Sequence, residues 1–190
     1  GVTADVTTVP VVREVVAATL RHAGTDADAY SGATMIELLQ NHPRTDLFSA
    51  DPELLARDLA DALEAVTARE VRVFLRADPR SAIVSAQIHL PRDRYTTRLR
   101  ATMQEHLAQR IGGHDAEYSA RITDAPLAAI HVLMRTEVVA GVQPAAPGTV
   151  TDLDGDLRSE IQSDLADAAR SWDEQLCATA TSGDAELDES

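Results

Sequence analysis

Residues 71–90 read VRVFLRADPRSAIVSAQIHL and contain two apolar runs with a turn between them. In each run the apolar side chains recur at every second residue, as they do along a strand with one buried face. In the second run they are Val84, Ala86, Ile88 and Leu90. The intervening DPRS, residues 78–81, has the composition of a tight turn. This stretch therefore predicts an antiparallel β-hairpin.

The alternation resumes after a long helical segment. An apolar stripe runs through residues 91–111, and we predict a helix that begins at Pro91 and ends at Gly112. Two further strands are predicted at 117–122 and 128–135. Their buried residues are expected to be Tyr118, Ala120 and Ile122 in the first strand and Ile130, Val132 and Met134 in the second.

A helix is also predicted upstream of the hairpin, at residues 51–69, where Asp51-Pro52 has the composition of a helix start. The middle of the chain therefore reads αββαββ. Two helices on one face of a four-stranded antiparallel sheet bury their apolar surfaces in two layers. We expect this α+β, ferredoxin-like fold for residues 51–139, with flanking helices.

The rest of the chain divides into four segments. Residues 1–50 predict a helical lead-in, and residues 140–151, rich in Pro, Gly and Ala, predict a linker. A long amphipathic helix is predicted at 152–178. Residues 179–190 have the composition of an acidic, disordered tail.

The charge and apolar patterning exclude several partners. The chain has 31 acidic and 17 basic residues, a net charge of −14, and this charge repels the phosphate backbone of nucleic acids. No apolar run approaches the length of a membrane-spanning helix, and no signal peptide is recognised. Cys177 has no second cysteine to pair with. We expect a soluble, cytoplasmic segment of a longer polypeptide, because Gly1 is not an initiator Met.

The residues needed for most catalytic sites are missing. All basic residues are arginine, so chemistry that requires a lysine amine is excluded. Neither a GxSxG nor a GxGxxG motif is present. The six histidines stand singly, without metal-ligand spacing, and His89 and His131 are expected to face solvent or a helix edge. We predict no catalytic residue, metal site or cofactor in this segment, which is therefore not an enzyme by itself.

Four arginines break a local rule at the start of the predicted 91–111 helix. They are Arg92, Arg94, Arg98 and Arg100. Positive charge is disfavoured at a helix N-terminus, and such a breach is a pointer to function. Arg94 and Arg98 lie one turn apart and could clamp a carboxylate of a ligand or partner. Pairing with the acidic residues of the chain itself is the simpler alternative.

The predicted helix at 152–178 carries a long apolar stripe that could reach a neighbouring domain. Leu165, Trp172 and Leu176 lie on it and are predicted to form a packing interface.

Four stretches carry a resemblance to a known family. They are residues 42–48 (HPRTDLF), 71–79 (VRVFLRADP), 89–97 (HLPRDRYTT) and 171–176 (SWDEQL). In order and spacing they resemble the N-terminal region of the large bacterial NAD-specific glutamate dehydrogenases. The resemblance covers about residues 30–180 and is strongest at 91–97.

The resemblance implies a regulatory or assembly segment similar to ACT-type domains, which are small ferredoxin-like modules that bind amino acids. The parent enzyme would be a homo-oligomer that converts L-glutamate, NAD and water to 2-oxoglutarate, ammonia and NADH, with its NAD site outside this segment. Its other domains and subunits, and an amino-acid effector, are the expected partners. A free-standing small-molecule-binding or protein-interaction module is the alternative.

Overall fold

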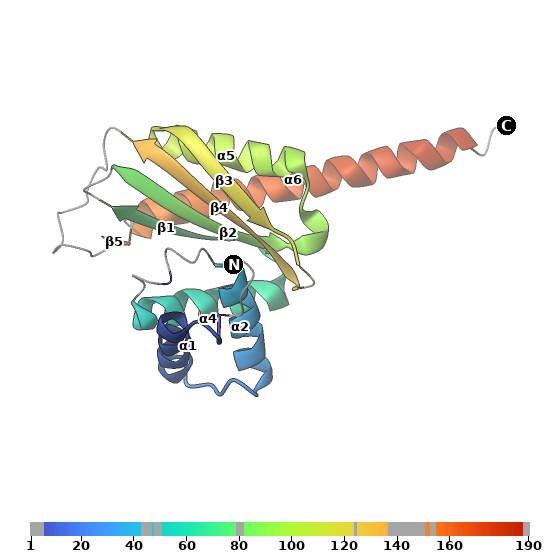
Figure 1. Ribbon diagram of the computed structural model, residues 1–190. Helices are drawn as coiled ribbons and strands as arrows, with labels where there is room; N and C mark the ends of the chain where they lie inside the picture. The colour runs from blue at the N-terminus through green and yellow to red at the C-terminus, as the bar shows by residue number, and fades with distance from the viewer. Residues whose placement is uncertain are drawn as a thin grey trace.

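A computed structural model gives the fold of the chain and describes residues 6–42, 47, 51–78, 82–123, 125–136, 151–152 and 155–187. An antiparallel sheet lies at the centre, between two layers of helices (Figure 1). The strands are β1 (Arg72–Asp78), β2 (Ile83–Pro91), β3 (Gly113–Arg121), β4 (Leu127–Thr136) and β5 (Thr151–Asp152). The helices are α1 (Pro10–His22), α2 (Tyr30–Asn41), α4 (Pro52–Ala68), α5 (Thr97–Ile111) and α6 (Gly155–Leu187), with a 3₁₀ turn, η1 (Arg92–Arg94), before α5.

The sheet has the order β3-β4-β2-β1-β5. The predicted hairpin is confirmed, with Leu75 opposite Ala86, and β4 pairs with the other side of β2. The two-residue β5 extends the sheet beyond β1. The predicted α+β fold, with a four-stranded antiparallel sheet and two helices on one face, is therefore confirmed.

The helix pair on that face differs from the expected one. Helices α5 and α6 cover it, whereas the helix predicted at 51–69, α4, packs with α1 and α2 against the opposite face. From β1 onward the order is ββαββα, which is the ferredoxin-like order βαββαβ begun at its second strand. Both α4 and α6 have an apolar stripe, and the stripe alone does not specify which face of the sheet it covers.

Helix α5 begins later than predicted. Pro91 is the last residue of β2, opposite Leu127, and the helix starts at Thr97. Thr96 is its N-cap, because the Thr96 hydroxyl accepts a hydrogen bond from the Leu99 amide at 3.0 Å. The predicted end is confirmed: Gly112 is the C-cap with a left-handed φ of 65°.

The main core lies between the sheet and the α5–α6 layer. The sheet contributes the predicted Val84, Ala86, Ile88, Leu90, Ile130, Val132 and Met134, and the two helices contribute Leu99, Met103, Leu107, Ile161, Leu165 and Ala169. Each fully buried Leu or Ile stabilises the fold by about 2 kcal/mol. Tyr118 and Ile122 were expected in this core, but they are 51% and 50% exposed because they belong to the edge strand β3 and to the residues that follow it.

The second core joins α1, α2 and α4 to the other face of the sheet. Leu38, Leu39, Leu55 and Leu59 are buried there, and Phe74 and Leu127 are the sheet residues of this cluster. We call α1, α2 and α4 together the helical module. The two faces of the sheet are therefore both covered by helices.

Helix α6 continues to Leu187, past the predicted end at 178 and through most of the predicted tail. Its C-terminal half projects beyond the sheet (Figure 1). The predicted linker 140–151 lies outside the described residues, apart from Thr151 in β5. Among the described helices, none is both long and apolar enough to cross a membrane.

Candidate functional site

The four arginines singled out from the sequence lie on two elements. Arg92 and Arg94 belong to η1, and only Arg98 and Arg100 lie in the first turn of α5. Their partners differ. Arg94 donates a hydrogen bond to the Arg69 carbonyl oxygen at 3.3 Å, whereas the Arg98 guanidinium lies 5.1 Å from the ring centroid of Trp172. Arg94 and Arg98 therefore make different contacts in the structure.

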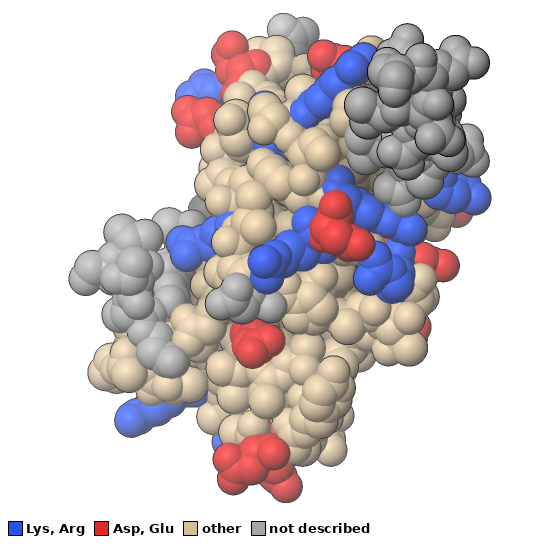
Figure 2. Space-filling model, turned by 90° about the vertical axis from the view of Figure 1, so that its right-hand side faces the viewer, with Lys and Arg blue, Asp and Glu red and all other residues tan. Residues whose placement is uncertain are grey.

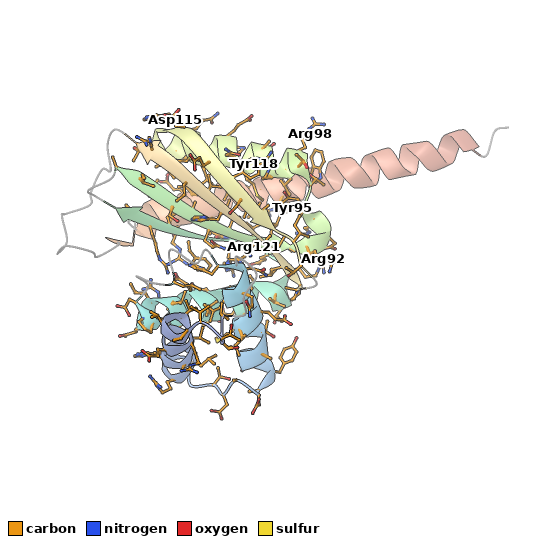
Figure 3. All side chains as sticks on the ribbon, in the orientation of Figure 1. Arg92, Tyr95, Arg98, Asp115, Tyr118 and Arg121 are labelled. Carbon is orange, nitrogen blue, oxygen red and sulfur yellow. The ribbon has the colours of Figure 1, made fainter. Side chains whose placement is uncertain are left out.

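Arg100 points to a third place. Its guanidinium lies 3.8 Å from the ring centroid of Tyr118 on β3, and it donates a hydrogen bond to Gln104 at 2.8 Å. Figure 3 shows Arg92 and Arg98 well apart from each other at the end of the molecule from which α6 projects, with Tyr118 on the strand β3. The group is spread over one end of the molecule, instead of surrounding one point.

This end of the molecule has a basic surface. Figure 2 shows Lys and Arg side chains, which are all Arg in this chain, gathered across the middle of this face, with acidic side chains among them. One acid at this end is Asp93, which pairs with Arg69. The hydrogen bond from Arg69 lowers the pKa of Asp93. A basic surface on a chain of net charge −14 is suited to an acidic partner or ligand.

A groove of about 400 Å³ opens beside this surface, between α5 and α6. Helix α5 lines it with Arg98, Leu99, Thr102 and His106, and α6 lines it with Asp164, Asp167, Ala168, Ser171 and Trp172. Small-molecule sites typically have volumes of about 300–1,000 Å³. The groove is therefore large enough for a metabolite.

The groove carries charges of both signs. Arg98 and Trp172 line it together, and Asp164 and Asp167 add carboxylates from α6. Asp164 accepts a hydrogen bond from Arg110 at 2.6 Å, and this bond raises the pKa of Arg110. The indole N–H of Trp172 is buried and has no hydrogen-bond partner among the described residues. A ligand with both a carboxylate and an ammonium group matches this arrangement.

The three residues of the predicted packing interface have different positions. Leu165 is fully buried in the main core, and Trp172 packs partly against the same core while also lining the groove. The side chain of Leu176 lies outside the described residues. Leu165 therefore holds α6 to its own sheet.

Sequence reasoning missed His106, Asp164 and Asp167 as groove residues. A signal was present, because residues 98, 102 and 106 on α5 and residues 164, 168 and 172 on α6 recur at intervals of four. Residues at this interval lie on one face of a helix. The sequence does not show that these two faces meet.

The sequence matches known protein families over most of its length. The chain belongs to the glutamate dehydrogenase ACT2 domain family, whose profile matches residues 72–173, from β1 into α6. A second profile, glutamate dehydrogenase helical motif 1, matches residues 9–67, which hold the helical module.

The full-length relatives are NAD-specific glutamate dehydrogenases. The one from Mycobacterium tuberculosis is 30% identical over 177 residues, which are 93% of this chain and 11% of the relative. Those from Halomonas elongata and Pseudomonas aeruginosa are each 27% identical over 168 residues, which are 88% of this chain and 10% of each relative. The resemblance drawn from the sequence motifs is thereby confirmed. The chain spans about a tenth of the length of these relatives.

Proposed function

We propose that this chain is a non-catalytic regulatory and assembly segment of a large, cytoplasmic, homo-oligomeric NAD-dependent glutamate dehydrogenase. The parent enzyme converts L-glutamate, NAD and water to 2-oxoglutarate, ammonia and NADH, and binds NAD elsewhere. The similarity to NAD-specific glutamate dehydrogenases over most of this chain supports the parent's activity. The absence of lysine from the 190 residues supports a catalytic centre elsewhere, because this segment offers no amine for it.

The α5–α6 groove carries the regulatory part of the proposal. An amino-acid effector places its carboxylate against Arg98 and its ammonium group against Asp164 or Asp167. A ligand there contacts two helices that pack on the same sheet, so binding changes the packing of α6 against α5. Helix α6 projects from the body and conveys the change to its neighbours (Figure 1).

Calorimetry of the chain with a panel of amino acids tests this site. We expect heat with at least one of them, and loss of that heat in Arg98→Gln, which removes the charge beside Trp172. Arg21→Gln is the matched control, because Arg21 lies at the end of α1, in the helical module across the sheet. Absence of heat with every amino acid would sink the sensing part of the proposal.

Two surfaces support the assembly part. In the described part of the chain β3 pairs with β4 alone, so one of its edges is open to another strand. The projecting half of α6 also needs a neighbour, because an isolated helix shorter than about 15 residues is only marginally stable in water. A density map of the parent oligomer tests this part. We expect β3 or the end of α6 buried against another segment, and a map with both in solvent would contradict it.

A further inference from the structure

Three histidines are buried between the sheet and the helical module. His42 is the C-cap residue of α2, His89 belongs to β2 and His131 to β4. They are 6%, 3% and 9% exposed, and Gln87 of β2 is buried with them. We call His42, Gln87, His89 and His131 the histidine layer. It lies where the helical-motif match (9–67) meets the ACT2 match (72–173).

The expectation that His89 and His131 face solvent or a helix edge is corrected by this arrangement. The strand alternation correctly assigns them to the face opposite Ile88 and Ile130. The helical module covers that face and buries both histidines. The prediction from the sequence placed helices on the other face only, so this face was expected to be open.

The histidine layer is short of hydrogen-bond partners. Among the described residues, His42 Nε2, His89 Nδ1 and both amide atoms of Gln87 are buried without one. His131 Nε2 is bonded to the Ser85 hydroxyl at 2.8 Å. Buried nitrogen atoms without acceptors leave no compensation for an added positive charge.

A permanent charge is already present beside the layer. Arg76 of β1 pairs with the buried Asp58 of α4 at 2.6 Å, and this ion pair joins the sheet to the helical module. Among the described residues, the charged and titratable groups that face the layer are His42 after α2, Asp58 on α4, Arg76 on β1, His89 on β2 and His131 on β4.

Burial opposes protonation of His89, and burial together with nearby positive charge opposes protonation of His42. Burial lowers the pKa of His89 to about 4. Burial, and then the positive charges of Arg76, His89 and His131, hold the pKa of His42 well below its ordinary value. The main core on the other side of the sheet consists of apolar side chains.

We propose that the docking of the helical module on the sheet is linked to protons: the histidine layer must be neutral for the two to remain packed, and its protonation releases α1, α2 and α4 while α5 and α6 stay in place. The device lies across the sheet from the α5–α6 groove and goes beyond the proposed function. It makes the junction between helical motif and ACT2 domain sensitive to acid.

The sign of the effect follows from the histidine pKa values. The released state has ordinary histidines with a pKa near 6.5, whereas His89 in the packed state has a pKa of about 4. The packed state is therefore fully favoured above about pH 6.5 and loses stability as the pH falls toward 4. Within this window each such histidine increases the released population about tenfold per pH unit.

Hydrogen exchange of the 190-residue chain, expressed as protection factors, tests the proposal between about pH 7 and about pH 5, because ordinary carboxylates begin to protonate below this range. We expect amide protection in α1, α2 and α4 to fall at least about tenfold per pH unit below pH 6.5. Protection in α5 and in α6 up to Trp172 is expected to change by less than about threefold, because no buried His, Asp or Glu lies in their core among the residues that the structure describes. An equal loss of amide protection in the helical module and in α5–α6, or no loss in either, would overturn the proposal.

Two variants and a control sharpen the test. His89→Gln and His42→Asn remove a titrating group and keep a polar side chain, so each is expected to reduce the pH slope of the helical module. His22→Gln replaces an exposed histidine at the end of α1 and is expected to leave the slope unchanged. If the pH slope is unchanged in both His89→Gln and His42→Asn, the histidine layer is not the cause of the pH dependence and the proposal is refuted. If a variant does not fold, the wild-type exchange profile decides, since selective loss supports the proposal and uniform or absent loss refutes it.

Discussion

A methyl group on Gly32 would lie 1.9 Å from the carbonyl oxygen of Asp26, on a backbone that cannot move aside freely. Gly32→Ala is therefore expected to lower the free energy of unfolding by about 2 kcal/mol or more, through overpacking at the start of α2. Gly155→Ala is the control, because nothing lies within 4 Å of its added methyl group. Urea unfolding of both variants measures the difference. Equal stabilities of the two variants would show that the backbone at the start of α2 has room for a methyl group on residue 32.

Some single residues could be read from the sequence and others could not. Asp51 was predicted to cap α4, and its carboxylate accepts a hydrogen bond from the Glu53 amide at 2.9 Å. Pro91 was misread as a helix start because proline suits both the first turn of a helix and the end of a strand. The groove residues His106 and Asp164 come from helices more than 50 positions apart along the chain. No local pattern brings such residues together.

The outer edge of β1 is closed by a side chain as well as by β5. The Val73 amide donates to Gln162 Oε1 at 2.7 Å, and Gln162 Nε2 donates to the Val71 carbonyl. The Gln162 amide thus satisfies the edge as a neighbouring strand would.

Gln162→Ala is expected to lower the free energy of unfolding by about 2 kcal/mol, because a partly buried amide and a carbonyl lose their partner. The exposed neighbour Ser163 provides the control, and Ser163→Ala is expected to change stability by less than about 0.5 kcal/mol. Thermal or urea unfolding distinguishes the two. A Gln162→Ala protein as stable as its control would mean that water satisfies this edge equally well.

At the level of elements, the period-two pattern predicted β1, β2 and β4 because their apolar residues face a large core. The same pattern failed for the side chains around β3, since an edge strand has less of its surface covered. Which helix covers which face was also beyond the sequence, because α4 and α6 are both amphipathic. The second helical layer, and with it the histidine layer, followed only from the structure.

Arg158 joins the three layers of the molecule. From α6 it donates to the Val73 carbonyl of β1 at 3.1 Å and to Asp61 of α4 at 3.1 Å. Its guanidinium also lies 4.9 Å from the ring centroid of Phe74. This one side chain therefore links α6, on one face of the sheet, to β1 and to α4 on the opposite face.

Arg158→Ala is expected to lower the free energy of unfolding by about 2 kcal/mol, since it leaves a β1 carbonyl and a ring contact without their partner. Arg170, which pairs with Asp167 on its own helix and is exposed, provides the comparison. Arg170→Ala is expected to cost less than about 0.5 kcal/mol. Equal losses in the two variants, measured by urea unfolding, would show that Arg158 does not hold the layers together.

The central proposal is that this chain is the non-catalytic part of a NAD-dependent glutamate dehydrogenase. Its most direct test is the rate of NADH formation from L-glutamate and NAD by the purified 190-residue chain, with a full-length relative as the positive control. We predict no NADH formation above the rate without protein, because the chain has no lysine and no dinucleotide-binding motif. Glutamate-dependent NADH formation by the chain alone would contradict the claim.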